Sequence, residues 1–235
     1  MLANQLALAL IRRARKKAAG RSFVSTGGLR KKALAALPFK LTGAQENALK
    51  EIDADLASPD RMVRLVQGDV GSGKTAVAFL AAASVIDAGS QTALLAPTEI
   101  LARQHIETLT PIAEKAGIRI DILTGRDKGG VRTEKLRRLK AREIDLLIGT
   151  HAIIQDEVEF ADLGLVIIDE QHRFGVNQRA ALSAKGWRAD LIVMTATPIP
   201  RTLALTAYGD MDATSIREKP PGRKPVDTRA IPIER

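Results

Sequence analysis

Apolar residues occur in two alternating patterns from residue 40 onward. Short continuous apolar runs, such as 163–168, are typical of strands in a parallel sheet that is buried on both faces. Between them lie stretches in which apolar positions recur every three or four residues, as on one side of a helix. We expect strands at 62–67, 92–96, 118–123, 145–149, 164–168 and 190–195, and helices at 43–57, 74–88, 98–116, 131–142 and 177–185. The alternation predicts an α/β domain with a mostly parallel sheet and helices on both faces.

The two ends of the chain depart from this alternation. Residues 2–18 predict an amphipathic helix whose basic cluster follows its apolar residues, which is the reverse of the order in a signal peptide. An organelle transit peptide and a linker helix are both compatible with that segment, and a short basic helix is expected around 29–37. Residues 219–225, which contain three prolines, are typical of a linker. We therefore divide the chain into a basic linker helix region at 1–40, a main domain at 41–218 and a linker at 219–235.

The net charge indicates a class of function only when its distribution along the chain is known. The formal net charge is +9, but residues 1–40 hold ten of the 36 Lys and Arg residues and none of the 27 Asp and Glu residues. The main domain is therefore close to neutral, and its charge alone does not indicate nucleic-acid binding. The absence of cysteine excludes disulfides and thiolate metal sites and is compatible with a reducing cytoplasm. The three histidines are too far apart in sequence to suggest zinc, and no apolar run approaches the roughly 20 residues of a membrane span.

A phosphate-binding loop is the most specific motif in the chain. Residues 68–75 fit the pattern G-x-x-x-x-G-K-[ST] between a predicted strand and a predicted helix, which is the context that the motif requires. Its glycines allow backbone N–H groups to surround a triphosphate, Lys74 can reach the β and γ phosphates, and the Thr75 hydroxyl can bind Mg²⁺. The alternative is a glycine-rich turn without a ligand. The motif predicts a nucleoside triphosphate bound by Gly68, Gly71, Ser72, Gly73, Lys74 and Thr75.

Two carboxylates follow the apolar run at 163–168. Asp169 could hold the Mg²⁺ that Thr75 also binds, and Glu170 could polarise the water that attacks the γ phosphate. The alternative is an ordinary acidic turn. At the end of the next predicted strand, Thr195 and Thr197 could bond to the acidic turn, or could simply form a threonine-rich strand end before Pro198.

The pattern T-x-x-Q at 42–45 opens the first predicted helix of the main domain. Taken by itself, this pattern is that of a helix capping box. A glutamine amide can also donate to and accept from an adenine edge, so Gln45 has a second possible role. Without further context, the cap is the favoured interpretation.

Taken together, the motifs resemble those of the superfamily 2 helicases in order and in spacing. The segments Ala96–Ala102 and Gly149–His151 belong to the same set. Three segments, at 169–176, 195–202 and 207–212, resemble more specifically the RecG family of bacterial branched-DNA helicases. The resemblance covers about residues 25–230. The transcription–repair coupling translocases share much of this pattern, but they usually have glutamate where this chain has Gln171.

The resemblance implies a RecA-like P-loop motor domain that uses ATP and Mg²⁺. It implies that Phe39 lies near the base and Gln45 reads adenine, that Lys74, Asp169 and Glu170 are catalytic, and that Thr75 and Asp169 hold the metal. It assigns coupling of hydrolysis to movement to Gln171, His172, Thr195 and Thr197. It places Pro97, Thr98, Glu99, Thr124, Gly125, Thr150, His151 and Arg201 against DNA, where main-chain and hydroxyl contacts to phosphate position the duplex rather than read its sequence.

The resemblance also implies partners. Branched double-stranded DNA is the expected substrate, and the expected protein is monomeric, bacterial, cytoplasmic and nucleoid-associated. Family members are longer, with a wedge domain before the motor and a second motor domain that supplies an arginine finger. We therefore expect this chain alone to hydrolyse ATP very slowly. The alternatives are the motor of a transcription–repair coupling translocase and a nucleotide- or DNA-binding module without turnover.

A basic stretch at 126–142 allows two interpretations. Eight bases stand against two acids there, and they could form a solvated helix face or a strip that binds phosphates. The solvated face is favoured. The bases are Arg126, Lys128, Arg132, Lys135, Arg137, Arg138, Lys140 and Arg142.

Overall fold

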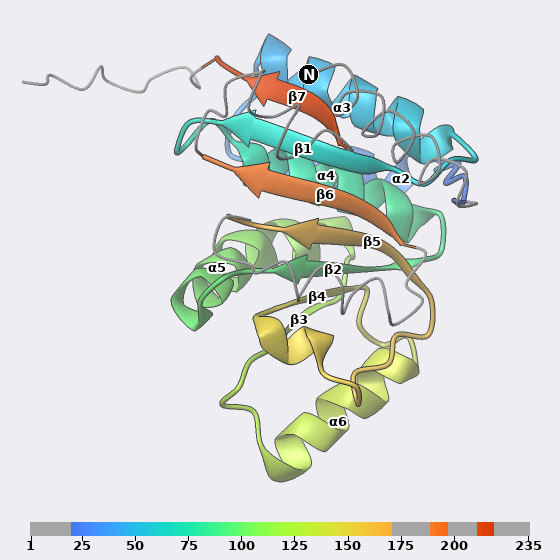
Figure 1. The fold of residues 1–235 in the computed structure, drawn as a ribbon, viewed down its shortest axis with the longest axis vertical. Helices are drawn as coiled ribbons and strands as arrows, with labels where there is room; N and C mark the ends of the chain where they lie inside the picture. The colour runs from blue at the N-terminus through green and yellow to red at the C-terminus, as the bar shows by residue number, and fades with distance from the viewer. Residues whose placement is uncertain (1–19, 171–188, 197–210, 219–235) are drawn as a thin grey trace, which may run out of the picture.

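The computed structural model describes residues 20–170, 189–196 and 211–218 of the chain. A parallel sheet lies at its centre, with the strand order β3-β4-β2-β5-β6-β1-β7 (Figure 1). The strands are β1 (Val63–Gly68), β2 (Gln91–Leu95), β3 (Ile120–Leu123), β4 (Leu146–Gly149), β5 (Leu163–Ile168), β6 (Asp190–Thr195) and β7 (Asp212–Ile216). The helices are α2 (Gly28–Ala36), α3 (Gly43–Ala57), α4 (Lys74–Asp87), α5 (Glu99–Ala116) and α6 (Gly129–Lys140), with a 3₁₀ turn, η1, at His151–Ile154.

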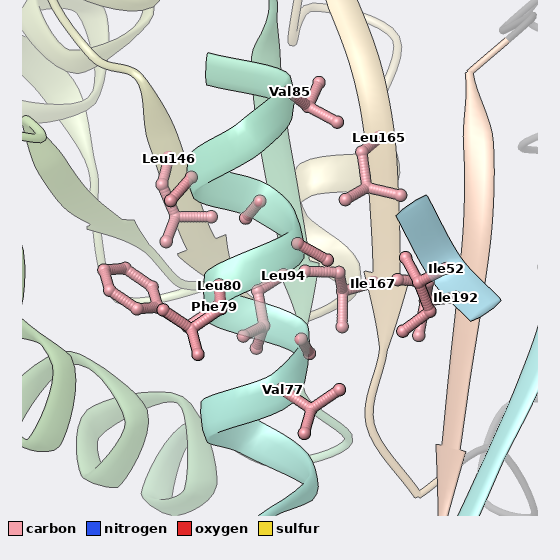
Figure 2. Close-up of a cluster of buried hydrophobic side chains, with 14 of the residues drawn as sticks. Ile52, Val77, Phe79, Leu80, Val85, Leu94, Leu146, Leu165, Ile167 and Ile192 are labelled. Atoms are coloured by element: carbon pink, nitrogen blue, oxygen red, sulfur yellow. The ribbon is translucent and has the colours of Figure 1, made fainter. Parts of the chain in front are cut away.

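Successive side chains of the inner strands enter different cores, because a strand has a period of two. On one face, β2 contributes Leu94 and β5 contributes Ile167 to a large core that includes residues of α2 to α5. Figure 2 shows the centre of this core, where side chains of α4 lie against the sheet. Helix α4 is apolar on nearly all sides, which suits a helix enclosed by the sheet and other helices.

A second core lies on the opposite face of the sheet. Leu139 of α6 and Ile153 of η1 pack there with Leu147 of β4 and Val166 of β5. Helices therefore cover both faces of the sheet, as the sequence predicted. In Figure 1, α6 lies at the β3 end of the molecule and α3 lies at the β7 end.

The segment that precedes the predicted main domain belongs to the same folded unit from Gly20 onward. Phe23 and Ala33 are buried in the large core, and α2 packs on α4 and α5. The Asp87 carboxylate, at the end of α4, accepts hydrogen bonds from the hydroxyls of Ser25 and Thr26. Residues 20–40, which the sequence analysis assigned to the linker region, therefore pack on the main domain. Residues 1–19, which include most of the predicted first helix, lie outside the described part.

The remaining elements agree closely with the predicted spans. Helix α3 has the predicted bounds, and Gly117 ends α5 in the left-handed conformation, with φ 78°. Strand β7 was not predicted, and neither was η1. The helix predicted at 177–185 lies outside the described residues. Within the described part of the chain, no helix has the length and hydropathy needed to cross a membrane.

Candidate nucleotide site and sheet edge

The phosphate-binding loop and the two carboxylates lie at the same edge of the sheet. Strand β1 ends at Gly68 and leads into the loop, and β5 ends at Ile168 directly before Asp169. Strand β6 lies between them and pairs in parallel with both, so the carboxyl ends of these strands point to one side (Figure 1). Ligands of open parallel sheets bind outside this edge. The fold thus brings together residues that are about 95 positions apart in the sequence.

The loop needs its glycines for two different reasons. Gly71 and Gly73 have φ values of 78° and 85°, a region that side chains rarely adopt. A Cβ at Gly68 would collide with the Ser72 hydroxyl, and one at Gly73 would collide with the amide of Gln45. Gly73 is also the N-cap residue of α4, so the positive end of that helix faces the loop.

Lys74 bends back over the loop. Its Nζ donates to the carbonyl oxygens of Gly68, at 2.6 Å, and Asp69, at 3.0 Å. Burial lowers the pKa of Lys74, and the negative charges of Glu170, Asp169 and Asp69 oppose that shift. The ammonium group therefore lies within electrostatic reach of both predicted catalytic carboxylates. A triphosphate could take the place of the two carbonyl oxygens as the partner of Lys74.

Asp169 is held at two points by the β2–α5 unit. Its backbone N–H donates to the Leu95 carbonyl oxygen at 2.9 Å, and its Oδ2 lies 2.8 Å from Nε2 of His105 on α5. Both residues are buried, with 8% of Asp169 and 9% of His105 exposed. Sequence reasoning considered His105 only as a zinc ligand and missed this contact. The one available signal was its position on the helix that follows the 96–102 motif.

Glu170 has a left-handed backbone, with φ 50°. This conformation is uncommon outside glycine and occurs in turns as well as at functional sites. Arg142, after α6, has it too, with φ 58°.

Gln45 has a different environment from the one that the resemblance implied. Its Oε1 accepts from the Thr42 N–H at 2.9 Å, which completes the predicted capping box. Its Nε2 donates to the Ser72 carbonyl oxygen at 2.8 Å, and the residue is fully buried. Both ends of the amide therefore bind protein, and in this arrangement neither is open to an adenine edge. Phe39 is 42% exposed, which leaves its ring accessible to a base.

The residues around the loop fit a magnesium–nucleotide complex. The Ser72 hydroxyl is buried and has no hydrogen-bond partner in the described part of the chain. Thr75, in the first turn of α4, supplies a hydroxyl and Asp169 supplies a carboxylate, so the available ligands are hard oxygens. No group of three or more His, Asp or Glu residues that could hold a metal occurs among the described residues.

The residues that the resemblance assigned to DNA follow three neighbouring strands, β2, β4 and β3. Thr98 caps α5 by accepting from the Leu101 N–H, and Thr124 is buried and bonded to Asp127. Gly125 faces open space and His151 is exposed. These segments form a second group on the same sheet edge, next to the carboxylates after β5, and β5 and β6 separate them from the strand of the nucleotide loop. They comprise Pro97, Thr98 and Glu99 after β2, Thr150 and His151 after β4, and Thr124 and Gly125 after β3.

Seven of the eight bases in the stretch at 126–142 pair with acidic residues. Arg138 pairs with Asp121, and Arg137 pairs with both Glu134 and Glu143. These contacts support the solvated helix face. The further pairs are Arg126–Glu99, Arg132–Glu157, Lys135–Asp127, Lys140–Glu159 and Arg142–Asp162.

Several predicted site residues lie outside the described part. They are Gln171, His172, Thr197 and Arg201. Thr195 is described: it is the last residue of β6, is buried and pairs in register with Gln67 of β1. It therefore lies at the sheet edge between the loop and the carboxylates.

Comparisons with known proteins agree with this fold. A DEAD/DEAH box helicase family model matches residues 42–206. The chain is 58% identical to the ATP-dependent DNA helicase RecG of Bacillus subtilis over 192 residues, which are 82% of this chain and 28% of that protein. It is 48% identical to RecG of Escherichia coli strain K12 over 239 residues, covering 100% of this chain and 34% of that protein. The chain thus spans about a third of the length of these relatives.

Solved structures show the same architecture. A structure of RecG bound to a three-way DNA junction superposes with a TM-score of 0.81 at 46% identity, over 94% of this chain and 30% of that one. The DEAD-box helicase Mss116 has a TM-score of 0.63 at 16% identity, covering 83% of this chain and 43% of that one, and shows the fold alone. The expected RecA-like fold and the resemblance to RecG are confirmed. The chain belongs to the DEAD/DEAH box helicase family.

Proposed function

We propose that this chain is the ATP-binding motor domain of a helicase that moves on branched double-stranded DNA, as at stalled replication forks and Holliday junctions. The observation that carries the proposal is the position of the phosphate-binding loop after β1, at the same sheet edge as the carboxylates after β5, with only β6 between the two strands. The similarity to RecG, including one structure on a three-way junction, supports the choice of substrate. The bacterial relatives support a cytoplasmic protein that acts on the nucleoid.

The residues of the loop would bind the triphosphate. Backbone N–H groups from Gly71 to Thr75 would surround the phosphates, and Lys74 would turn from the loop carbonyls to the β and γ phosphates. The Thr75 hydroxyl and Asp169 would hold Mg²⁺, which supplies charge neutralisation for the transferred phosphoryl group. Glu170 would orient and deprotonate the attacking water.

The base would lie away from the carboxylates, near Phe39. Gln45 would act on the nucleotide through the loop, because its amide binds the Ser72 carbonyl oxygen. The described structure thus supports a bracing role for Gln45 and leaves recognition of the base to other groups.

The second group at the sheet edge would contact DNA. Open backbone at Gly125 and the exposed side chain of His151 suit contacts to phosphate, which position a duplex without reading it. Arg201 would contribute a charge there. Gln171, His172, Thr195 and Thr197 would connect this group to the nucleotide. An arginine finger from a second RecA-like domain would complete the site and accelerate hydrolysis by on the order of 10³-fold or more.

The test is ATP hydrolysis by the intact protein as its gene encodes it, with forked DNA, linear duplex and no DNA. Forked DNA should stimulate hydrolysis most. Glu170→Gln should reduce turnover by at least about 10² while ATP binding persists, because general-base catalysis contributes about that much. Glu107→Gln, at an exposed position on α5, is the matched control and should leave turnover unchanged. The proposal fails if Glu170→Gln retains wild-type turnover. If the wild-type protein binds ATP but does not hydrolyse it, the result favours a nucleotide-binding module.

A further inference from the structure

Asp169, the carboxylate proposed to hold Mg²⁺, contacts the same β2–α5 unit that contains the proposed DNA-binding segment. Strand β2 ends at Leu95, residues 96–98 follow, and α5 begins at Glu99. Asp169 receives its backbone contact from Leu95 and its side-chain contact from His105, so both restraints come from this unit. The segment at 97–99, which the proposed function places against DNA, lies between the two contact points in sequence.

The His105 contact has the properties of a positioning interaction. A carboxylate only accepts hydrogen bonds, so His105 must donate from Nε2 to Asp169. The side chains of His105 and Asp169 are only 11% and 12% exposed, so water cannot easily replace the histidine. The bond engages Oδ2 and fixes the rotation of the carboxylate. Carboxylates that bind metals are commonly held in this way, and losing such a partner typically costs 10–100-fold in metal affinity or activity.

We propose that His105 is a positioning residue for Asp169, and that it transmits DNA binding at the start of α5 to the magnesium site. This inference rests on the proposed function. Movement of α5 when DNA binds at 97–99 would move the imidazole, and with it the carboxylate that holds Mg²⁺. His105 lies six residues beyond the start of α5, close enough for a rigid helix to carry that movement.

The first test measures Mg²⁺ directly. Binding of a fluorescent ATP analogue to the intact protein is titrated with Mg²⁺, for the wild type, His105→Leu and His105→Gln. Leucine removes the donor at similar volume, whereas the glutamine amide nitrogen reaches the position of Nε2. We expect His105→Leu to raise the Mg²⁺ midpoint about 10–100-fold and His105→Gln to stay close to the wild type. Nucleotide binding in EDTA should be the same in all three.

The controls separate positioning from general damage. Thr110→Val removes a hydrogen bond within α5, from Thr110 to the Ile106 carbonyl oxygen, and should not move the midpoint. Adding His105→Leu to Asp169→Asn should have no further effect, because the two residues act as one unit. If His105→Leu does not fold, His105→Asn takes its place, since the shorter amide cannot reach Asp169. A midpoint that is unchanged in the variant without the donor overturns the positioning role.

The second test adds forked DNA to the same titration. The wild-type midpoint should shift when DNA binds, and the shift should disappear in His105→Leu. If forked DNA does not change the wild-type Mg²⁺ midpoint, or if the shift persists in His105→Leu, His105 does not transmit DNA binding to the magnesium site. If the wild type binds no nucleotide in any condition, the proposed function itself fails. Wild-type binding that depends on Mg²⁺ but not on His105 sinks this inference alone.

Discussion

The buried amide of Gln45 satisfies two backbone groups at once. It accepts from the Thr42 N–H at the start of α3 and donates to the Ser72 carbonyl oxygen in the phosphate-binding loop. Each group would be costly to bury without a partner. A single side chain therefore joins a helix cap to the nucleotide loop, and its effect on ATP should come through the shape of the loop.

Gln45→Ala separates that role from recognition of adenine. We expect it to lower the free energy of unfolding by about 2 kcal/mol, from the lost cap and the unpaired Ser72 carbonyl. Binding should weaken by a similar factor for ATP and GTP, because no contact to the base is removed. Competition between the two nucleotides on the wild type and the variant measures this. A selective loss of ATP binding would mean that Gln45 reads adenine after all.

Asp190 should make stability depend on pH. Burial raises its pKa to about 7, and the hydrogen bond from the Met62 N–H and the charge of Arg61 oppose the shift. Its Oδ2 has no hydrogen-bond partner in the described part of the chain. Between about pH 4 and 7 the folded protein holds a proton that the unfolded chain releases. The free energy of unfolding should therefore fall as the pH rises through this window, by up to about 1.4 kcal/mol per pH unit.

Asp190→Asn tests this, because the amide stays neutral and its Oδ1 can still accept from Met62. Urea unfolding at pH 5 and pH 8 should show the variant gaining stability relative to the wild type at the higher pH. Parallel changes in the two proteins would contradict the assignment.

At the scale of elements, hydrogen bonds to Asp87, the last residue of α4, hold the 20–36 segment against that helix. Its carboxylate accepts from Thr26, Ser25 and the backbone N–H groups of Gly27 and Leu29, so it caps α2 from outside. These bonds, chiefly the one from Thr26, lower the pKa of Asp87 to about 2 despite the opposing effect of burial. This stabilisation should be present above about pH 4 and lost as the pH falls through 2.

Asp87→Ala should lower the free energy of unfolding by about 2–3 kcal/mol, since several charge-assisted bonds are lost. Limited proteolysis should then cut first within 20–28, because that segment loses its anchor. Asp60→Ala, at an exposed position, is the control. Equal protease resistance in both variants would show that core contacts alone hold the segment.

Elements with strong local patterns could be predicted from the sequence, and elements held by distant contacts could not. The run that forms β5 is apolar throughout, and Thr42 and Gln45 mark the start of α3. Strand β7 has few apolar residues and is fixed by pairing with β1 and by a hydrogen bond from Arg64 to Thr214. The loop and the carboxylates were recognisable as motifs. The His105–Asp169 contact joins residues that are 64 positions apart, and no local pattern in the sequence indicates it.

At the scale of the whole molecule, DNA has two candidate surfaces: the sheet edge beyond β2, β4 and β3, and the basic stretch around α6. The bases of α6 that point to solvent are paired with carboxylates, so a phosphate would have to displace an acidic partner to bind them. The sheet edge offers open backbone at Gly125, on the same edge of the sheet as the phosphate-binding loop. Under the proposed function, this edge is therefore the better place for DNA.

The salt dependence of DNA binding distinguishes the two surfaces. Each phosphate neutralised by a base adds close to one to the slope of log affinity against log salt concentration. The double variant Arg137→Ala, Arg138→Ala should therefore leave the slope unchanged, because these bases are already neutralised by Glu134, Glu143 and Asp121. Fluorescence anisotropy of a labelled fork, over a series of salt concentrations, measures the slope for the wild type and the variant. A slope lower by one or two would place α6 on the DNA, and the path of the duplex would then extend from the nucleotide edge across the β3 end of the molecule.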